Sequence, residues 1–360
     1  MRLFWDFGGY SSNTKHRPVY VRICSMPQKE GEIVTGAAPK NIIICCDGTG
    51  NDYGVHKTNV VRVCEIAVKS DSQLVYYDPG VGTDGESFTP RIIGKSVKNA
   101  WQKMFGTGLQ RNVGEAYRFL MKVYRPGDRV YIFGFSRGAY TARSLAGMLY
   151  RCGLLHFGLD NLVEQATNLY NKNESHLQRG FKDNFCARPC PVHFIGVWDT
   201  VESLGVITGR KFHDCRLNPE IKHAYHAVSL DEKRSKVSPC LWEEANIAEG
   251  QTMEQVWFAG VHCDVGGWYE ERGLSDIALR WMLKKAEQCG MQLDSQKFVE
   301  VKGDFAGKQH ESLIGIWKLM GESEREVPSG GKVHESVKAR MEETGYTPVK
   351  PLTDDVEWVE

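Results

Sequence analysis

The stretch VYIFGFSRGAYTAR, residues 130–143, passes from strand-forming residues into a helical pattern through one serine between two glycines. Gly134, Ser136 and Gly138 match the pattern Gly-x-Ser-x-Gly. A serine on a sharp turn between a strand and a helix has a strained backbone, and small neighbours let the strand and the helix pack closely around it. Its hydroxyl then stands at a helix N-terminus, which favours developing negative charge. The pattern predicts a nucleophilic serine, and the alternative is an ordinary glycine-rich turn.

Apolar runs alternate with helical patterns along the rest of the chain. Short continuous apolar runs that end in turn residues are typical of parallel strands covered on both faces. We expect such strands within 41–51, 73–83, 129–135, 191–201 and 255–269. Helical spacing predicts helices over 58–68, 110–124, 141–153 and 274–290, and 331–341 is a strand-to-helix candidate. This alternation predicts an α/β fold with a mostly parallel sheet and helices on both faces.

We expect a single α/β domain over residues 41–345, since no internal repeat or low-complexity linker divides it. An irregular extension, residues 1–40, precedes this domain, and a tail, residues 346–360, follows it. Polar and aromatic residues near 156–190 and 203–253 predict two inserted segments that form a helical lid.

Composition limits the classes of partner. The 360 residues carry 45 Lys and Arg against 45 Asp and Glu, so no overall field favours nucleic acid or an anionic membrane. Eleven cysteines without regular spacing indicate reduced thiols in a cytosol-like compartment. No signal-peptide core and no membrane-spanning apolar run is found. We expect a cytoplasmic protein without a nucleic-acid partner or a cofactor. Export by a route that needs no signal peptide is also compatible with this sequence.

A serine nucleophile needs a base, and the base needs an acid that orients it. Both are expected directly after later strands, because ligands of open parallel sheets bind at the carboxyl ends of the strands. His262 follows the run QVWFAGV and leads as the base, with His334 as its rival. Asp199 follows FIGVW and leads as the acid. Asp264 would be the acid if His334 were the base, and otherwise would brace the turn DVGG.

Acyl transfer also requires N–H groups that stabilise an oxyanion. One is expected from Arg137, directly after the serine, and a second from the loop DGTGN, in which Gly48 and Thr49 are placed to donate. Asp47 would hold that loop, or would bind a cation together with Asp264. The loop lacks the Gly-Lys-Ser/Thr ending of a phosphate loop, so nucleotide binding is not expected.

Several motifs occur together and in one order: CCDGTGN, YYDPGVGT, GFSRGAYTARSLAGML, GVWDTV, AVSLDEKRSKVSPCLW, QVWFAGVHCDVGGWY and LSDIALRWM. In this combination they resemble the catalytic domain of the type VI secretion phospholipase effectors, a lipase class with Gly-Phe-Ser-Arg-Gly. The resemblance covers about residues 41–290 and extends more weakly through VHESV.

The resemblance implies an α/β-hydrolase fold with a Ser-Asp-His triad that cleaves acyl esters of phospholipids. Matched by motif, the triad is Ser136 in GFSRG, Asp199 in VWDT and His262 in GVHCDVGG. Two positions beside the base depart from the pattern: Cys263 replaces a small polar residue, and Trp268 replaces a glycine. The secreted effectors also carry membrane-binding modules, for which we expect no room after the core of this chain.

The expected function is that of a serine hydrolase that cleaves carboxylic esters, above all of phospholipids, through an acyl-enzyme. Its substrate would be a lipid or a small ester, and a transient contact with a membrane surface is compatible with this. One alternative is a non-catalytic domain of the same fold that binds a lipid or a protein. Another is a metal-assisted phosphoester hydrolase that uses Asp47, Asp199, His262 and Asp264.

Overall fold

The computed structural model describes residues 38–48, 56–80, 95–172, 174–201, 216–319 and 321–360. Within these residues, eight strands form one sheet in the order β10-β9-β8-β7-β6-β3-β1-β2, and all neighbours are parallel. The strands of this sheet are β1 (Asn41–Cys46), β2 (Gln73–Asp78), β3 (Arg129–Phe135), β6 (Val192–Trp198), β7 (His223–Ser229), β8 (Thr252–Phe258), β9 (Lys332–His334) and β10 (Glu357–Val359). Two short strands, β4 (Leu154–Leu155) and β5 (Cys186–Arg188), pair antiparallel apart from it.

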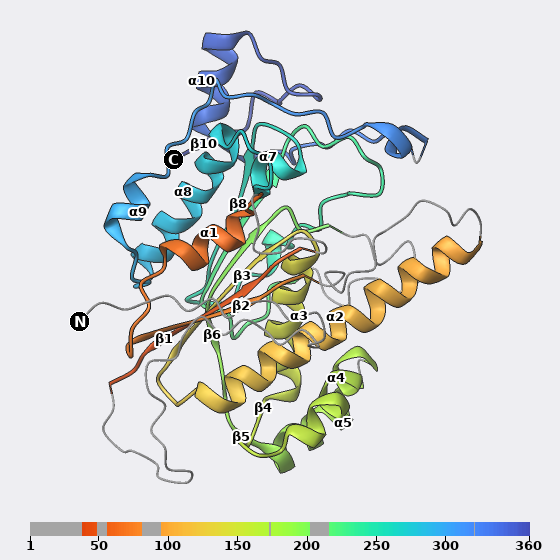
Figure 1. Cartoon of the computed structure of the whole chain (residues 1–360), viewed down its shortest axis with the longest axis vertical. Coiled ribbons are helices and arrows are strands. Elements are labelled where there is room, and N and C mark those ends of the chain that lie inside the picture. The colour runs from red at the N-terminus through yellow and green to blue at the C-terminus, as the bar shows by residue number, and fades with distance from the viewer. Residues whose placement is uncertain (1–37, 49–55, 81–94, 173, 202–215, 320) are drawn as a thin grey trace, which may run out of the picture.

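Helices cover both faces of the sheet (Figure 1). One face carries α2 (Lys95–Val123), α3 (Arg137–Cys152), α4 (Val163–Lys172) and α5 (Ser175–Phe185). The other face carries α1 (Asn59–Ile66), α8 (Gly273–Gln288) and α9 (Ser295–Val299). The remaining helices of the described residues are α7 (His262–Gly266), α10 (Glu335–Thr344) and three short 3₁₀ turns, η1 (Asp160–Leu162), η2 (Glu244–Asn246) and η3 (Gly315–Leu319).

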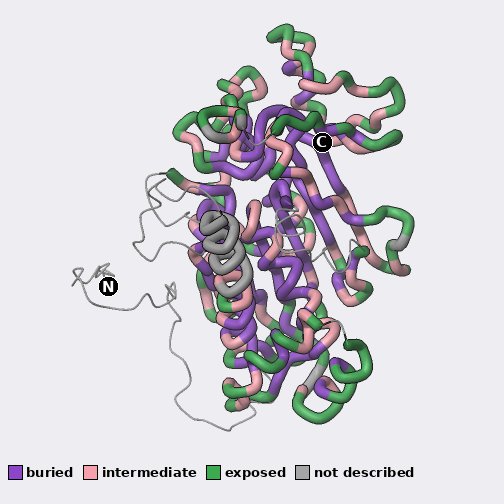
Figure 2. The backbone as a smooth tube through the Cα atoms, turned by 90° about the vertical axis from the view of Figure 1, so that its right-hand side faces the viewer, coloured by how far each residue is buried: buried purple, intermediate pink, exposed green. Residues whose placement is uncertain are grey.

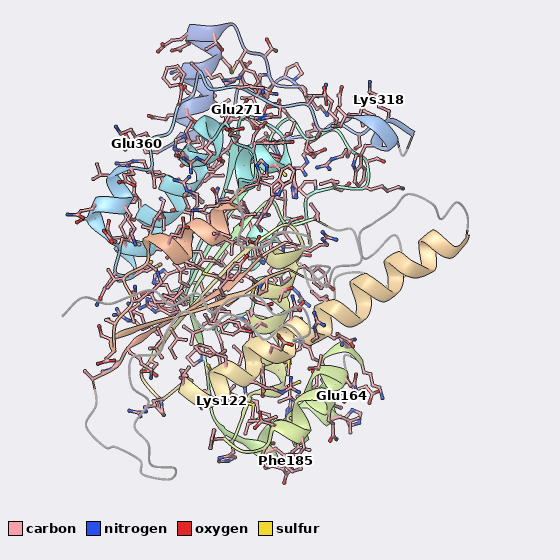
Figure 3. The ribbon with its side chains drawn as sticks, viewed as in Figure 1. Lys122, Glu164, Phe185, Glu271, Lys318 and Glu360 are labelled. Atoms are coloured by element: carbon pink, nitrogen blue, oxygen red, sulfur yellow. The ribbon has the colours of Figure 1, made fainter. Side chains whose placement is uncertain are left out.

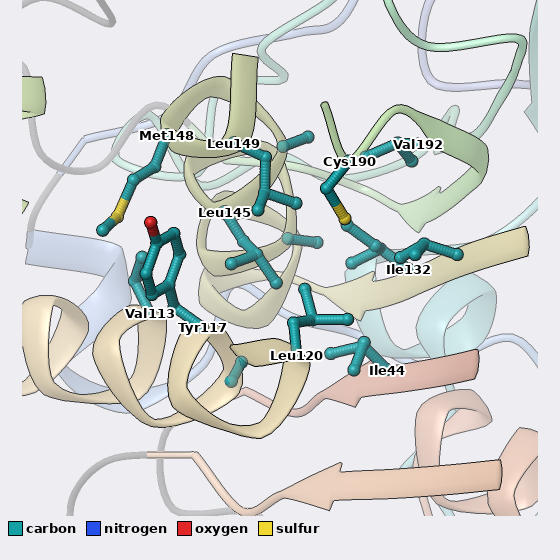
Figure 4. Close-up of a cluster of buried hydrophobic side chains, with 14 of the residues drawn as sticks. Ile44, Val113, Tyr117, Leu120, Ile132, Leu145, Met148, Leu149, Cys190 and Val192 are labelled. Carbon is teal, nitrogen blue, oxygen red and sulfur yellow. The ribbon is translucent and has the colours of Figure 1, made fainter. Parts of the chain in front are cut away.

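Strand β1 shows why the sheet is buried on both sides. Its residues alternate between the two helical layers: Ile42 and Ile44 join the apolar cluster under α2 and α3, and Ile43 joins the cluster under α1 and α8. Figure 4 shows the first cluster, with Ile44 and Ile132 from the sheet against side chains of α2 and α3. In Figure 2 the buried residues run through the centre of the molecule and the exposed ones lie on its outer loops.

The fold class expected from the sequence is confirmed. A parallel sheet lies between two helical layers, and the serine of the Gly-x-Ser-x-Gly pattern stands at the turn from β3 to α3. Strand β3 has the expected bounds, and α3 ends at Gly153 with a φ of 73°, which glycine adopts without strain. The strand-to-helix candidate 331–341 forms β9 and the first part of α10.

Three elements differ from the expectations. The strand expected over 255–269 ends at Phe258, because the chain turns at Gly260 (φ 103°) and forms α7. Strand β7 lies inside the segment 203–253 that was expected to be an insertion, and it pairs on both sides in the sheet. The tail 346–360 contributes the edge strand β10. The division into an extension, a domain and a tail otherwise stays a prediction.

Among the described helices, none combines the length and the apolar character that crossing a membrane requires.

Candidate active site

Ser136 occupies a strained turn. It stands between the last residue of β3 and the first residue of α3, with φ 57° and ψ −119°. Its backbone N–H donates to the carbonyl of Trp198 at the end of β6, at 3.1 Å. Non-glycine residues with positive φ are found at three described positions, Ser136, Asp199 and Trp268. Such strain persists only where the surrounding structure enforces it, and it gathers at functional sites.

The two glycines of the pattern allow this turn to exist. A Cβ atom added to Gly134 would lie 2.4 Å from the backbone oxygen of Gly138. A Cβ atom added to Gly138 would lie 2.1 Å from the backbone oxygen of Cys46, at the end of β1. Both clashes are with backbone atoms, so no side-chain rotation relieves them. The start of α3 can therefore pack against β1 and β3 only when both positions are glycine.

Asp199 and His262 lie together beside this turn. Asp199 directly follows β6, is 0% exposed, and has a φ of 41° that is fixed by its N–H bond to the carbonyl of Ala227 (2.8 Å). His262 begins α7, and its Nδ1 is hydrogen-bonded to Oδ2 of Asp199. Since a carboxylate only accepts, Nδ1 carries the proton and Nε2 is left as an acceptor. The His262 ring lies 4.6 Å from the ring of Phe135, the residue before Ser136.

After β8 the chain turns back over the sheet, which brings His262 next to the turn between β3 and α3. Strand β8, which precedes it, is separated from β3 by β6 and β7. The loop after α7 crosses back toward α1: Gly267 pairs with Thr58, and the N–H of Trp268 donates to the carbonyl of Lys57 at 3.0 Å. Gly266 packs so closely on Phe135 that an added Cβ atom would lie 1.9 Å from its ring.

Two acidic residues of the motif LDEKR, Asp231 and Glu232, hold the start of α7 in place through hydrogen bonds to its backbone. Oδ2 of Asp231 accepts the N–H of Gly260 at 2.6 Å, just before α7. Glu232, which is 1% exposed, accepts the N–H of His262 at 3.3 Å and pairs with Arg234 at 2.8 Å. Burial raises the pKa of Glu232, but Arg234 outweighs this and holds that pKa below its ordinary value. Both residues lie in the motif AVSLDEKRSKVSPCLW, but their role depends on contacts that the sequence does not reveal.

Arg325 belongs to the site, although no motif in the sequence points to it. Its guanidinium spans the Asp199 carboxylate, with Nη1 at 2.6 Å from Oδ1 and Nη2 at 3.0 Å from Oδ2. The N–H of Ser229 also donates to Oδ1, at 3.0 Å. Burial alone raises the pKa of Asp199, but Arg325 and His262 outweigh it, so that pKa lies well below its ordinary value. Asp199 is therefore a carboxylate at neutral pH.

The N–H of Gly48, one of the groups expected as the second oxyanion donor, already has a hydrogen-bond partner. The N–H of Gly48 donates to Oδ1 of its neighbour Asp47 at 2.7 Å. Oδ2 of Asp47 accepts from Thr58 Oγ1 at 2.8 Å and from Tyr77 OH at 2.9 Å, so Asp47 holds the end of β1 to its neighbours. Thr49 lies outside the described residues. Arg137 opens α3, where backbone N–H groups point out of the helix N-terminus.

The structure does not bring His334 and Asp264 together. His334 caps α10, accepts the N–H of Ser336 at 3.1 Å and stacks on Phe258, and burial lowers its pKa to about 4. Asp264 instead accepts the N–H of Val261 at 3.1 Å and the Nδ1–H of His310 at 2.6 Å. It thereby braces the first turn of α7.

Cys263 and Trp268, the two departures from the family pattern, have different properties in the structure. Burial raises the pKa of the Cys263 thiol to about 12, so it stays protonated at neutral pH. Trp268 has a φ of 108°, which glycine adopts freely and which strains any other residue. Its side chain is 39% exposed, with its ring 5.1 Å from that of His56.

No group of three or more His, Cys, Asp or Glu side chains in the described parts of the chain is arranged to hold a metal ion. The four residues considered for a metal site have separate partners. Asp47 binds Thr58 and Tyr77, Asp264 binds His310, and Asp199 binds Arg325 and His262.

Residues 40–285 match the family model described as T6SS, phospholipase effector Tle1-like, catalytic domain. The chain belongs to this family. The resemblance drawn from the motifs is therefore confirmed, and the match includes Ser136, Asp199 and His262 but ends before His310 and Arg325. The description of the Tle1-like family names a phospholipase effector.

Individual relatives of this Tle1-like chain include an uncharacterized protein of Saccharomyces cerevisiae, YEL023C, with 38% identity over 216 residues. That match covers 55% of this chain and 32% of the yeast protein, so the chain spans only about a third of that relative. A crystal structure of an uncharacterized protein from Pseudomonas aeruginosa is similar with 20% identity and a TM-score of 0.44, over 74% of this chain and 49% of that one. A crystal structure of Zea mays acyl-protein thioesterase 2 is similar with 10% identity and a TM-score of 0.32, over 69% of this chain and 95% of that one.

Proposed function

We propose that the protein is a serine hydrolase that cleaves carboxylic esters of lipids, with Ser136 as nucleophile, His262 as base and Asp199 as acid. The observation that carries the proposal is the hydrogen bond between His262 Nδ1 and a fully buried Asp199, beside a serine held at φ 57°. Membership in the phospholipase effector family supports the same reaction class. A buried carboxylate, an imidazole and a strained serine on one sheet edge are the parts that acyl transfer requires.

In the proposed first step, Nε2 of His262 takes the proton of the Ser136 hydroxyl while the oxygen attacks the ester carbonyl. Asp199 keeps the imidazole in the tautomer with a proton on Nδ1 and stabilises the imidazolium that forms. The imidazolium then gives its proton to the leaving alcohol, and an acyl-enzyme remains on Ser136. Water, deprotonated by His262, releases the acid and restores the serine.

The N–H of Arg137 is our preferred oxyanion donor, since it follows the nucleophile and opens α3. Gly48 and Thr49 stay a proposal for the second donor. Gly48 would have to give up its bond to Asp47 when the oxyanion forms. The family suggests a phospholipid as the substrate, and this too is part of the proposal.

The test is labelling of the purified protein with a fluorophosphonate probe, which reacts only with activated serines. We expect labelling of the wild type and none of Ser136→Ala, and at least a hundredfold slower labelling of His262→Ala. Ser144→Ala, which alters a buried serine of the same helix α3, is the matched control and should label like the wild type.

Two results would contradict the proposal. Labelling that persists in Ser136→Ala would remove the nucleophile, and an unlabelled wild type would remove the reaction class. Labelling that survives His262→Ala but disappears in His334→Gln would transfer the role of base to His334.

A further inference from the structure

A segment beyond the family match lies against the candidate site. Residues 308–319 and 321–327 place three side chains on its acidic groups. His310 Nδ1 binds Asp264 at 2.6 Å, Ser312 Oγ donates to Glu232 at 2.8 Å, and Arg325 binds Asp199. Figure 3 shows Lys318 on the short helix at the outer end of this segment and Glu271, a second partner of His310, near α7. The site is therefore completed by residues after 285.

Arg325 makes further hydrogen bonds besides those to Asp199. It is 6% exposed. Besides the two bonds to the carboxylate, Nη1 donates to the carbonyl (2.9 Å) and the hydroxyl (2.6 Å) of Ser229, and Nη2 donates to the carbonyl of Val237 at 2.6 Å. These bonds anchor the guanidinium plane to the ends of β7 and the turn that follows. A fixed planar fork imposes one orientation on the carboxylate that it binds.

We propose that Arg325 is a positioning residue that keeps Asp199 ionised and aims its Oδ2 at His262; this rests on the proposed function. A carboxylate buried as deeply as Asp199 tends to take up a proton unless a cation faces it. A protonated or rotated Asp199 would no longer fix the imidazole tautomer. Arg325 acts on the reaction only through Asp199 and contacts neither the serine nor the histidine in the described structure.

The positive charge of Arg325 also lowers the pH at which Asp199 takes up a proton. Without this charge Asp199 is protonated more easily, so the acid limb of activity moves to higher pH. Arginine beside a carboxylate commonly lowers its pKa by roughly one to three units, which is the upper limit of the expected movement. A residue with a merely structural role would lower activity at every pH without moving the limb.

The other charged or titratable side chains that face the pair are the same in every variant. Among the described residues they are His226 from β7, Glu232 from the turn after β7 and Cys263 from α7, and these in turn interact with Arg143, Arg234 and Asp264. A movement of the limb therefore reports on residue 325.

The experiment measures the rate of fluorophosphonate labelling from pH 5 to pH 9 for the wild type, Arg325→Met and Arg325→Lys. We expect Arg325→Met to label on the order of 10- to 100-fold more slowly at pH 7 and to move the acid limb upward. Arg325→Lys keeps the charge but loses the fork, so it should label more slowly with the limb near its wild-type position. Thermal unfolding at each pH identifies variants that are not folded.

Arg340→Gln is the matched control, because Arg340 is also a buried arginine of the C-terminal part and donates to the carbonyls of Phe305 and Gly307. It should lose stability and leave the limb in place. A labelled wild type with an unmoved limb in Arg325→Met would overturn this inference and leave the proposed function intact. An unlabelled wild type would instead contradict the proposed function. If Arg325→Met does not fold, an Arg325→Lys variant that labels as fast as the wild type would overturn the positioning role.

Discussion

Backbone strain marks the candidate site at the level of single residues. Ser136, Asp199 and Trp268, the described non-glycine residues with positive φ, belong to three separate turns, after β3, after β6 and after α7. Each conformation costs on the order of 1–3 kcal/mol, and the neighbouring bonds must offset that cost. For Ser136 the neighbours are two glycines, a carbonyl at the end of β6, and the packed start of α3.

Gly138→Ala tests this turn. The new methyl group would meet the backbone oxygen of Cys46 at 2.1 Å, so β1 and α3 must move apart. We expect a loss of roughly 2–4 kcal/mol in the free energy of unfolding, measured by urea denaturation, together with lost probe labelling. Gly180→Ala is the control, since Gly180 on α5 has open space around it and alanine favours helices. Equal stability of the two variants would contradict the tight turn.

At the level of secondary-structure elements, local patterns predicted what they encode and missed what depends on distant partners. Strand β3 and its turn were predictable because the residues that force them, Gly134 to Gly138, are adjacent in sequence. Strand β7 was missed because its run HAYHAVS carries two histidines and lies among the polar and aromatic residues that predicted an insertion. The end of β8 was placed too far along, because the apolar run continues into α7 while Gly260 turns the chain.

The role of His226 in β7 can be recognised only from the structure. It is 0% exposed; its Nε2 accepts the N–H of Thr200 at 3.1 Å, and its Nδ1 faces Oε1 of Gln255 at 3.4 Å. Burial lowers its pKa to about 3, with the charge of Arg143 acting in the same direction. The imidazole thus stays neutral and supports the residue that follows Asp199.

The pH dependence of stability tests this. The unfolded chain protonates His226 below about pH 6.5 and the folded protein does so only near pH 3, so acid favours unfolding between these values. The slope is at most roughly 1.4 kcal/mol per pH unit. Chemical denaturation from pH 7 to pH 4 should show a smaller loss for His226→Gln than for the wild type. His176→Gln, at an exposed position on α5, is the control and should match the wild type, and an equal loss in all three proteins would refute a neutral buried His226.

At the scale of the whole molecule, three apolar clusters formed by the described residues stabilise the fold. Two fill the layers on either side of the sheet, and the third joins β8 to β9 and α10 at one edge. Arg325 could not be predicted from sequence for the same reason that this edge could not. Both depend on contacts between segments far apart in the chain, and neither has a local motif.

Val333→Ala tests how independent this edge is. Val333 on β9 is 0% exposed and packs in the third cluster, so its truncation should cost roughly 1–3 kcal/mol. In hydrogen exchange we expect faster exchange in α10 and β10, and unchanged exchange in β1 and β3. Leu177→Ala, at a half-exposed position on α5, is the control and should leave both regions unchanged. Faster exchange throughout the sheet would indicate that the edge and the centre unfold together.

The order of the chain has a consequence for protein synthesis. Ser136, Asp199 and His262 leave the ribosome in that sequence, and Arg325 follows only after two further helices, α8 and α9, have been made. On the proposal that Arg325 keeps Asp199 ionised and oriented, a nascent chain that already contains the other three residues would react at only a small fraction of the full rate. Full hydrolytic activity would then begin only when translation has passed residue 325, so a stalled or prematurely terminated chain would release a much weaker hydrolase.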